Sequence, residues 1–225
     1  MSFFTFAWQW LTLASHWHGS AGVPARLIEH IEYTAIAMVI AAVIALPAGV
    51  AIGHTSRGGF AIISLANIGR SLPTLGLLIL VFVLTSGASW AWLIPLVALA
   101  IPPILVNSYE GVLGVDADLK DAAAGMGMTS RQVLFRVEVP VALPLILLGL
   151  RTATIQVVAT ATIAAYIGIG GLGRYIIDGL AVNNYGEVAG GAVLVVLLAL
   201  LVQFAFVGLA RLVVPAGLRK QAQQS

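Results

Sequence analysis

The sequence predicts an all-α protein that crosses a lipid bilayer several times. Of its 225 residues, 60% are hydrophobic and only 9% are charged, and the mean hydropathy is +1.03. A soluble domain carries about 25% charged residues, so most of this surface is expected to face lipid. At about 20 apolar residues per span, the chain has room for five or six helices, and five runs can cross. They are predicted at 33–52, 62–84, 90–106, 141–169 and 188–212.

We expect a transmembrane domain over 28–212, between an N-terminal segment 1–27 and a tail 213–225. Segment 1–27 is predicted to lie along the membrane surface, because its apolar run is too short to span. It also lacks the positive start of a signal peptide, since no Lys or Arg precedes Arg26. Trp8, Trp10 and Trp17 suit the headgroup zone. A sixth, partial helix is the alternative.

Helix-breaking and small residues characterise the predicted spans. Membrane helices tolerate proline where neighbouring groups satisfy the freed carbonyls. Gly and Ala are abundant in the last two runs, so close helix packing is expected there. The interrupting prolines are Pro47, Pro73, Pro95, Pro102, Pro103 and Pro144.

The basic residues predict the orientation in the membrane. If the N-terminus lies outside, only Arg26 and Arg174 fall on the outer side. Seven basic residues then fall on the cytoplasmic side, in agreement with the positive-inside rule. These seven are Arg57, Lys120, Arg131, Arg136, Arg211, Arg219 and Lys220.

Several kinds of chemistry are excluded by composition. The chain has no cysteine, and its four histidines lack metal-ligand spacing, so we predict no disulfide and no metal site. His30 and His54 are expected at membrane interfaces. The net charge of +2 comes from loop residues and gives no nucleic-acid footprint. Neither Lys120 nor Lys220 follows a phosphate-binding glycine loop. We therefore predict no catalytic residue and no cofactor, and any ATP and Mg must be bound by another chain.

The loop before the fourth span, 121–140, reads DAAAGMGMTSRQVLFRVEVP. Asp118 is predicted to cap a short helix that Gly127 ends, because glycine adopts a left-handed backbone most easily. Thr129-Ser130-Arg131-Gln132 has the pattern of a capping box that restarts the helix. One apolar stripe with helical spacing suits docking into a groove of a partner. An interfacial helix-turn-helix without a partner is the alternative. The stripe consists of Leu119, Ala122, Ala123 and Met126.

Polar residues at membrane depth are candidates for a translocation path or gate. Such residues usually face the bundle interior or a water-filled path. Thr152, Gln156 and Thr160 share one helical face, although threonine can also bond its own helix backbone. Arg70 and Arg151 lie near the inner boundary, where snorkelling is the alternative. The candidate set is Asn67, Arg70, Ser71, Arg151, Gln156 and Thr160.

The segment 168–187 is rich in glycine and polar residues and is predicted to lie outside. Its Gly170-Gly171-Leu172-Gly173 run is not a phosphate site, because it follows a membrane helix instead of a β-strand. A solvated loop is the alternative to contact with an external partner. The candidate contacts are Asp178, Asn183, Asn184 and Glu187.

Read with gaps, the loop 121–140 has the pattern D-A-A-x3-G-x9-V-x-V-P. This pattern resembles the EAA loop of permease subunits in binding-protein-dependent ABC importers, with Asp121 in place of Glu. Further segments resemble the osmoprotectant branch, which imports glycine betaine, choline, carnitine or related quaternary amines. These segments are RSLPT (70–74), IPPILVN (101–107), ATATIAAYIG (159–168) and GGLGRYI (170–176).

The resemblance implies a type I importer fold like that of methionine permeases, in a bacterial inner membrane. It implies a second permease chain, identical or paralogous, two ATPase subunits and an external substrate-binding protein. An EAA loop receives motion from the ATPase, here through Leu119, Asp121, Ala122, Ala123, Met126 and Gly127. An amino-acid or methionine permease is the alternative within the class. A secondary transporter would need acidic residues inside the membrane, and a membrane assembly factor is a third possibility.

Overall fold

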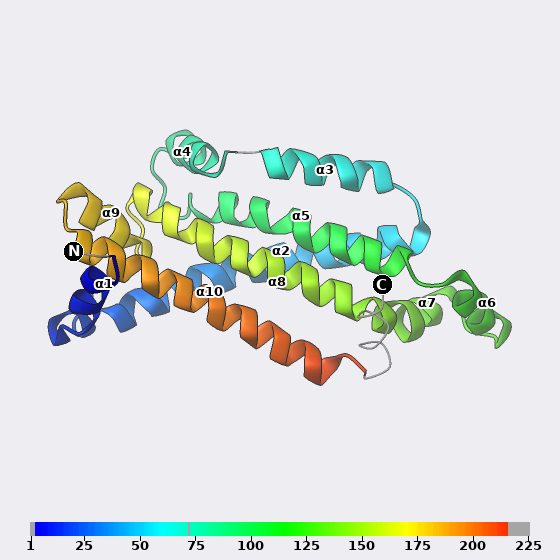
Figure 1. Ribbon diagram of the computed structural model, residues 1–225. Coiled ribbons are helices and arrows are strands. Elements are labelled where there is room, and N and C mark those ends of the chain that lie inside the picture. The colour runs from blue at the N-terminus through cyan, green and yellow to red at the C-terminus, as the bar shows by residue number, and fades with distance from the viewer. Residues whose placement is uncertain (1–2, 72, 216–225) are drawn as a thin grey trace. The chain divides into compact units, whose positions relative to one another are not determined.

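The computed structural model describes residues 3–71 and 73–215, and within these ranges it contains helices and no strand (Figure 1). The longer helices are α1 (Phe3–Leu11), α2 (Val23–Thr55), α3 (Gly59–Ser71), α4 (Thr74–Leu84), α5 (Leu93–Leu113), α6 (Ala117–Gly125), α8 (Val139–Ala164), α9 (Gly173–Ala181) and α10 (Tyr185–Val213). The short ones are η1 (Ala14–Trp17), α7 (Ser130–Val133), the π-helical η2 (Leu134–Glu138) and η3 (Ala165–Ile167).

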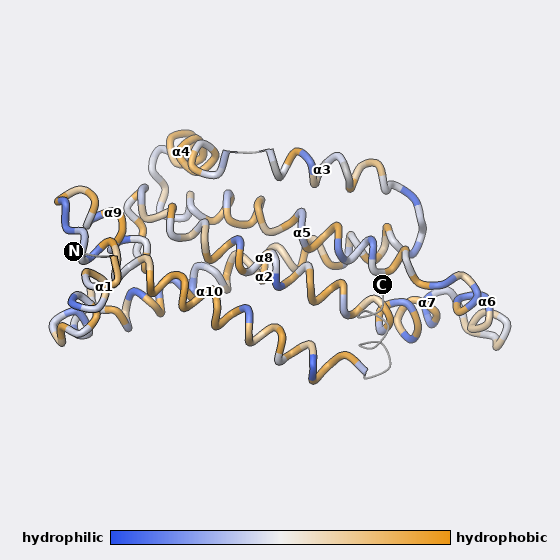
Figure 2. Tube along the Cα trace, viewed as in Figure 1, coloured by the Kyte–Doolittle hydropathy of each residue, from blue (hydrophilic) through white to orange (hydrophobic). Residues whose placement is uncertain are grey.

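Among the described residues, four helices are long and apolar enough to cross a membrane: α2, α5, α10 and the continuous run Ser130–Ile167. The pair formed by α3 and α4 is a fifth candidate. The predicted all-α membrane architecture is therefore confirmed. Figure 2 shows apolar residues along α4 and α10 and polar residues gathered around α6 and α7.

The observed helices differ from the predicted spans at several ends: α5 continues to Leu113, and the fourth span lies in a helical run that begins at Ser130. Helix α2, which contains the first predicted span, begins at Val23, ten residues before the predicted position 33. The second predicted span, 62–84, consists of two helices with a break before Pro73. Proline has no N–H to donate, and it disfavours helical backbone at the residue before it. The rule that membrane helices tolerate proline therefore fails at this position.

The chain forms two compact units, each with its own core. The first unit contains Met1–Val39, Leu72–Leu99 and Thr154–Val202, and the second contains Ile40–Ser71, Ala100–Ala153 and Gln203–Ser225. In the second unit, Val112, Ala142 and Ile146 form a core. Its helices approach closely at glycines: a Cβ at Gly49 would lie 2.7 Å from the carbonyl oxygen of Leu105. These close contacts allow little sliding between the helices.

Trp10 belongs to the core of the first unit, which corrects its expected place among the lipid headgroups. Only 6% of Trp10 is exposed. Its ring centroid lies 4.3 Å from that of His16 and 4.9 Å from that of Tyr175, and it fills the space left by Gly190. Burial raises the pKa of Tyr175 to about 12, and its hydroxyl donates to the carbonyl of Ala21. Trp8 and Trp17 are exposed, and their place in the headgroup zone stays a prediction.

His30 is fully buried in the first unit, which corrects its expected place at an interface. Its Nδ1 lies 3.3 Å from the Leu172 amide, which can only donate. Nε2 therefore carries the proton and donates to the Val158 carbonyl at 3.0 Å. The adjacent Glu29 accepts from the Gly171 amide at 2.7 Å. Two neighbouring side chains of α2 thus fix the glycine-rich turn that leads into α9.

Candidate functional site

The loop 114–140 forms the candidate site in the second unit, and its first helix is α6. Asp116 caps α6 by accepting from the Asp118 amide at 2.9 Å. The prediction that Asp118 is the cap is therefore wrong by two residues. Asp118 instead lies in the first turn, where a carboxylate is favoured by the helix dipole. An aspartate fulfils each role, so the start of the helix is well fixed.

The turn after α6 has the predicted left-handed glycine. Gly127 has φ +84°, and its amide donates to the Ala124 carbonyl at 2.9 Å. A Cβ at this position would meet nothing within 4 Å. The requirement for glycine is therefore a requirement for backbone conformation alone.

The second helix of the loop starts with the predicted capping box. Thr129 Oγ1 accepts from the Gln132 amide at 3.4 Å, and Gln132 Oε1 accepts from the Thr129 amide at 2.8 Å. α7 then continues through the π-helical η2 into α8. The loop is thus joined to a long membrane helix without a flexible linker.

The predicted apolar stripe does not form a single exposed surface. Leu119 is 44% exposed, Met126 is 74% exposed and Ala122 is exposed. Ala123 is only 2% exposed; it lies on a helix that contacts α7 and η2. We call Leu119, Ala122 and Met126 the exposed α6 face. Asp121 is also exposed, and Ala123 holds α6 within its own chain.

A buried carboxylate at Glu138 connects the loop to the end of α2. Glu138 is 2% exposed, and its Oε2 lies 2.6 Å from His54 Nδ1. Its Oε1 forms an ion pair with Lys120 Nζ at 3.8 Å. His54 Nε2 lies 2.7 Å from Ser130 Oγ. His54 is therefore part of a specific network and does more than lie at an interface.

Sequence reasoning missed Glu138, because the loop pattern leaves its position unspecified. A single carboxylate at the start of a long apolar run was a usable signal, since a charge there needs a partner. The partner, His54, lies 84 residues away in the sequence, and nothing local identifies it.

The predicted path residues divide between the two units. Asn67, Ser71 and Arg151 belong to the second unit, and Gln156 and Thr160 belong to the first. Asn67 and Ser71 are exposed, Arg151 and Gln156 are half-buried, and Thr160 is buried. The side chain of Arg70 lies outside the part of the chain that the structure describes. The path assignment therefore stays a prediction.

The predicted contact residues of 168–187 lie in the first unit and partly stabilise their own fold. Asp178 forms an ion pair with Arg174 at 2.8 Å. Asn184 caps α10 by accepting from the Glu187 amide at 3.3 Å, and its side-chain amide donates to the Glu187 carboxylate. Asn183 has φ +56° and is exposed. It has the freest side chain of the four.

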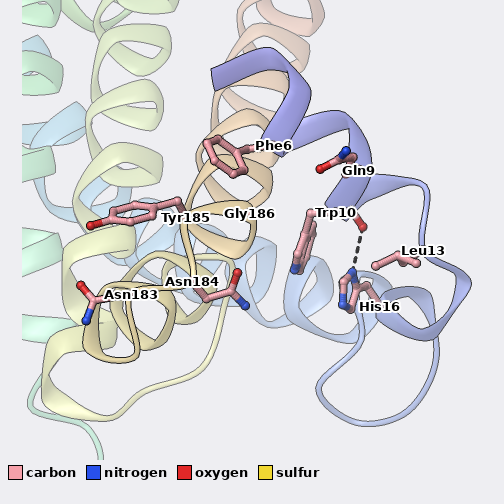
Figure 3. A pocket seen from close by; sticks show the side chains of 9 residues that line it. All are labelled: Phe6, Gln9, Trp10, Leu13, His16, Asn183, Asn184, Tyr185 and Gly186. Carbon is pink, nitrogen blue, oxygen red and sulfur yellow. Dashed lines mark hydrogen bonds between the residues drawn. The ribbon is translucent and has the colours of Figure 1, made fainter. Parts of the chain in front are cut away.

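A pocket of about 460 Å³ adjoins these residues (Figure 3). In Figure 3 the rings of Trp10 and Tyr185 point in different directions, and His16 Nδ1 donates to the Trp10 carbonyl at 2.8 Å. Because the aromatic rings do not converge, the pocket is not an aromatic cage of the kind that binds quaternary amines. Its lining residues are Phe6, Gln9, Trp10, Leu13, His16, Asn183, Asn184, Tyr185 and Gly186.

Comparison with known proteins gives consistent matches. Residues 42–217 match the family described as binding-protein-dependent transport system inner membrane component. The chain is 36% identical to the glycine betaine/carnitine/choline transport system permease protein OpuCB of Bacillus subtilis (strain 168), over 88% of this chain and 91% of the relative. It is 35% identical to the choline transport system permease protein OpuBB of the same organism, over 89% and 92%.

A solved structure shows the same fold. The chain superposes on an inward-facing structure of the MetNI methionine ABC transporter with a TM-score of 0.75 and 25% identity, covering 86% of this chain and 96% of that one. The predicted type I importer fold, similar to that of methionine permeases, is therefore confirmed.

Proposed function

Because the chain belongs to the family of binding-protein-dependent transport system inner membrane components, we propose that it is the permease subunit of an ATP-driven osmoprotectant importer. Its substrate is a small quaternary amine such as glycine betaine, choline or carnitine. The observation that carries this substrate class is the 35–36% identity, over nearly the whole length, to permeases named for these solutes. The same identities favour this function over that of a methionine or amino-acid permease or a secondary transporter.

We propose that a separate ATPase subunit binds ATP and Mg and docks on the exposed α6 face. Leu119 on α6 and Met126 at its C-cap are large, exposed apolar side chains, whereas the other side chains of this short helix are small or charged; such exposed apolar patches mark interaction sites. The caps at Asp116 and Thr129 hold this helix in a fixed position relative to α7. A rigid apolar face can transmit movement, whereas a flexible loop would absorb it. The side chain of Asp121 beside this face is shorter than glutamate and reaches less far toward the ATPase.

The proposed cycle is alternating access in a pair of permease chains, identical or paralogous. ATP binding closes the ATPase pair, the α6 loop follows, and the helices open outward to receive substrate from the external binding protein. Hydrolysis then resets the helices. This chain performs no covalent chemistry; it binds, positions and moves.

We place α6 in the cytoplasm and the segment 168–187 outside, on the distribution of basic residues. Arg219 and Lys220, which contribute to that distribution, lie outside the described residues. Asn183 is proposed to contact the binding protein, because its side chain is exposed at the turn between α9 and α10. Arg151 and Gln156 are retained as proposed path residues.

The function is tested by reconstituting the chain with its ATPase and binding protein in liposomes. We expect ATP-dependent uptake of radiolabelled choline, carnitine or glycine betaine, and none without ATP. Asn183→Gly, which keeps the left-handed turn, is expected to raise the binding-protein concentration needed for half-maximal uptake. Uptake of methionine alone, or uptake driven by an ion gradient without ATP, would contradict the proposal.

A further inference from the structure

The network around Glu138 joins parts of the second unit that the sequence keeps far apart. Glu138 ends η2 at the start of α8, His54 lies in the last turn of α2, and Lys120 lies on α6. Both carboxylate oxygens of Glu138 have a basic partner. Ser130, at the start of α7, completes the network through His54. One buried side chain therefore connects the end of α2 with α6, α7 and the start of α8.

The chemistry of the network makes it rigid. A buried carboxylate loses its hydration, so it depends on its partners, and removing one partner leaves an uncompensated charge. The 2.6 Å separation from His54 is that of a short, charge-assisted hydrogen bond. The Lys120 contact at 3.8 Å is longer and acts through charge alone. Glu138 is thus held firmly by α2 and more loosely by α6.

Lys120 lies next to Leu119 of the exposed α6 face. A displacement of that face therefore changes the distance between Lys120 and Glu138 first. η2 is a π-helical turn, a geometry that occurs often at functional sites. It inserts an extra residue relative to an α-helix and so shifts the side chains around the helix axis. The turn brings Glu138 to face the end of α2, where it meets His54.

We propose that Glu138 is a positioning residue that transmits movement of α6 to α2 and α8 together. This inference rests on the proposed function, since it assumes an ATPase docked on the exposed α6 face. Without Glu138, α6 would still dock, but α2 would not follow it. Loss of Glu138 would therefore reduce transport without reducing ATPase binding, whereas a change in the exposed α6 face would reduce both.

The test compares Glu138→Gln with Glu110→Gln, a matched control at an exposed position of α5 in the same unit. The glutamine keeps an acceptor for His54 but removes the charge that Lys120 pairs with. We expect ATPase co-purification to be unchanged and uptake to fall roughly tenfold, because the hydrogen bond to His54 loses its charge assistance and the ion pair with Lys120 is lost. Glu110→Gln should resemble the wild type. The double variant His54→Gln/Glu138→Gln should be no worse than Glu138→Gln alone, because both act through one contact.

A distance measurement separates positioning from simple stability. The chain has no cysteine, so spin labels at Thr55→Cys and Ala124→Cys need no background removal. We expect a narrow distance distribution in the wild type and a broad one with Glu138→Gln. Should Glu138→Gln be absent from the membrane, His54→Gln carries the same test, because Glu138 keeps Lys120.

Three contrary outcomes can be told apart. Wild-type uptake and a narrow distance distribution in Glu138→Gln would overturn the role of Glu138 while leaving the proposed function intact. If no ATPase co-purifies with the wild-type chain, the proposed function itself fails. Loss of ATPase co-purification only in Glu138→Gln would assign this residue to docking and also overturn the inference.

Discussion

At the scale of single residues, the left-handed backbone of Gly127 determines how α6 leads into α7. A non-glycine residue in this conformation costs about 1–2 kcal/mol, and a β-branched one is a marked outlier. Because a Cβ here meets no neighbour, the cost is conformational. We expect Gly127→Val to lower transport severalfold while membrane abundance, measured by immunoblot, stays near wild type.

The matched control for Gly127→Val is Gly125→Ala. Gly125 is the last residue of α6, and a Cβ there also meets nothing within 4 Å. Alanine favours helix over glycine by about 1 kcal/mol, so this variant should transport normally. Equal transport by Gly127→Val and Gly125→Ala would show that the turn geometry does not matter.

Local chemistry made some residues predictable and distance in sequence hid others. Gly127 and the Thr129 capping box followed from contacts within five residues. His30 bonds the carbonyl of Val158, 128 residues away, and Glu138 bonds His54, 84 residues away. A single sequence carries no pairing information at that range. In the sequence, His30 and Glu138 therefore look like isolated polar residues, and only the folded structure shows their partners.

At the scale of helices, hydropathy located the spans but not their ends. Helix α2 starts early because polar residues in its first turns have partners: Arg26 pairs with Glu29 at 2.9 Å. An apolar stretch in the sequence ends at such charged residues, although the backbone of α2 continues as a helix through them. The break between α3 and α4 was hidden for the opposite reason, since mainly apolar stretches, 60–69 and 75–84, lie on either side of it.

The docking surface on α6 gives a sharp prediction for a helix face. Ala122 lies on the exposed α6 face, whereas Ala124 is exposed elsewhere on the same helix. We expect Ala122→Glu to abolish ATPase co-purification, because a charge in a desolvated contact costs several kcal/mol. The identical change Ala124→Glu should leave co-purification unaltered. Equal binding by the two variants would place the ATPase on another surface.

Ala123→Glu is unsuitable for this purpose. Ala123 is buried within the second unit, so a glutamate there would disturb α6 itself before any partner binds. The stripe pattern could not reveal this, because helical spacing shows which residues share a face but not what covers that face.

At the scale of the whole molecule, composition predicted a membrane protein of about five spans, and the fold agrees. Its orientation rests on the distribution of charge alone. If the N-terminus lies outside, α6 faces the cytoplasm and the turn between α9 and α10 faces outward. Docking on α6 and contact at Asn183 both require this orientation, so a direct measurement tests both proposals together.

Because the chain has no cysteine, single cysteines report sidedness without background. Val182 is 71% exposed in the turn after α9, and Ala124 is exposed on α6. We expect a membrane-impermeant maleimide to label Val182→Cys in intact spheroplasts, and Ala124→Cys only after permeabilisation. A permeant maleimide, which should label both, is the control for reactivity. Labelling of Ala124→Cys from outside would invert the topology, and an ATPase in the cytoplasm could then no longer reach the exposed α6 face.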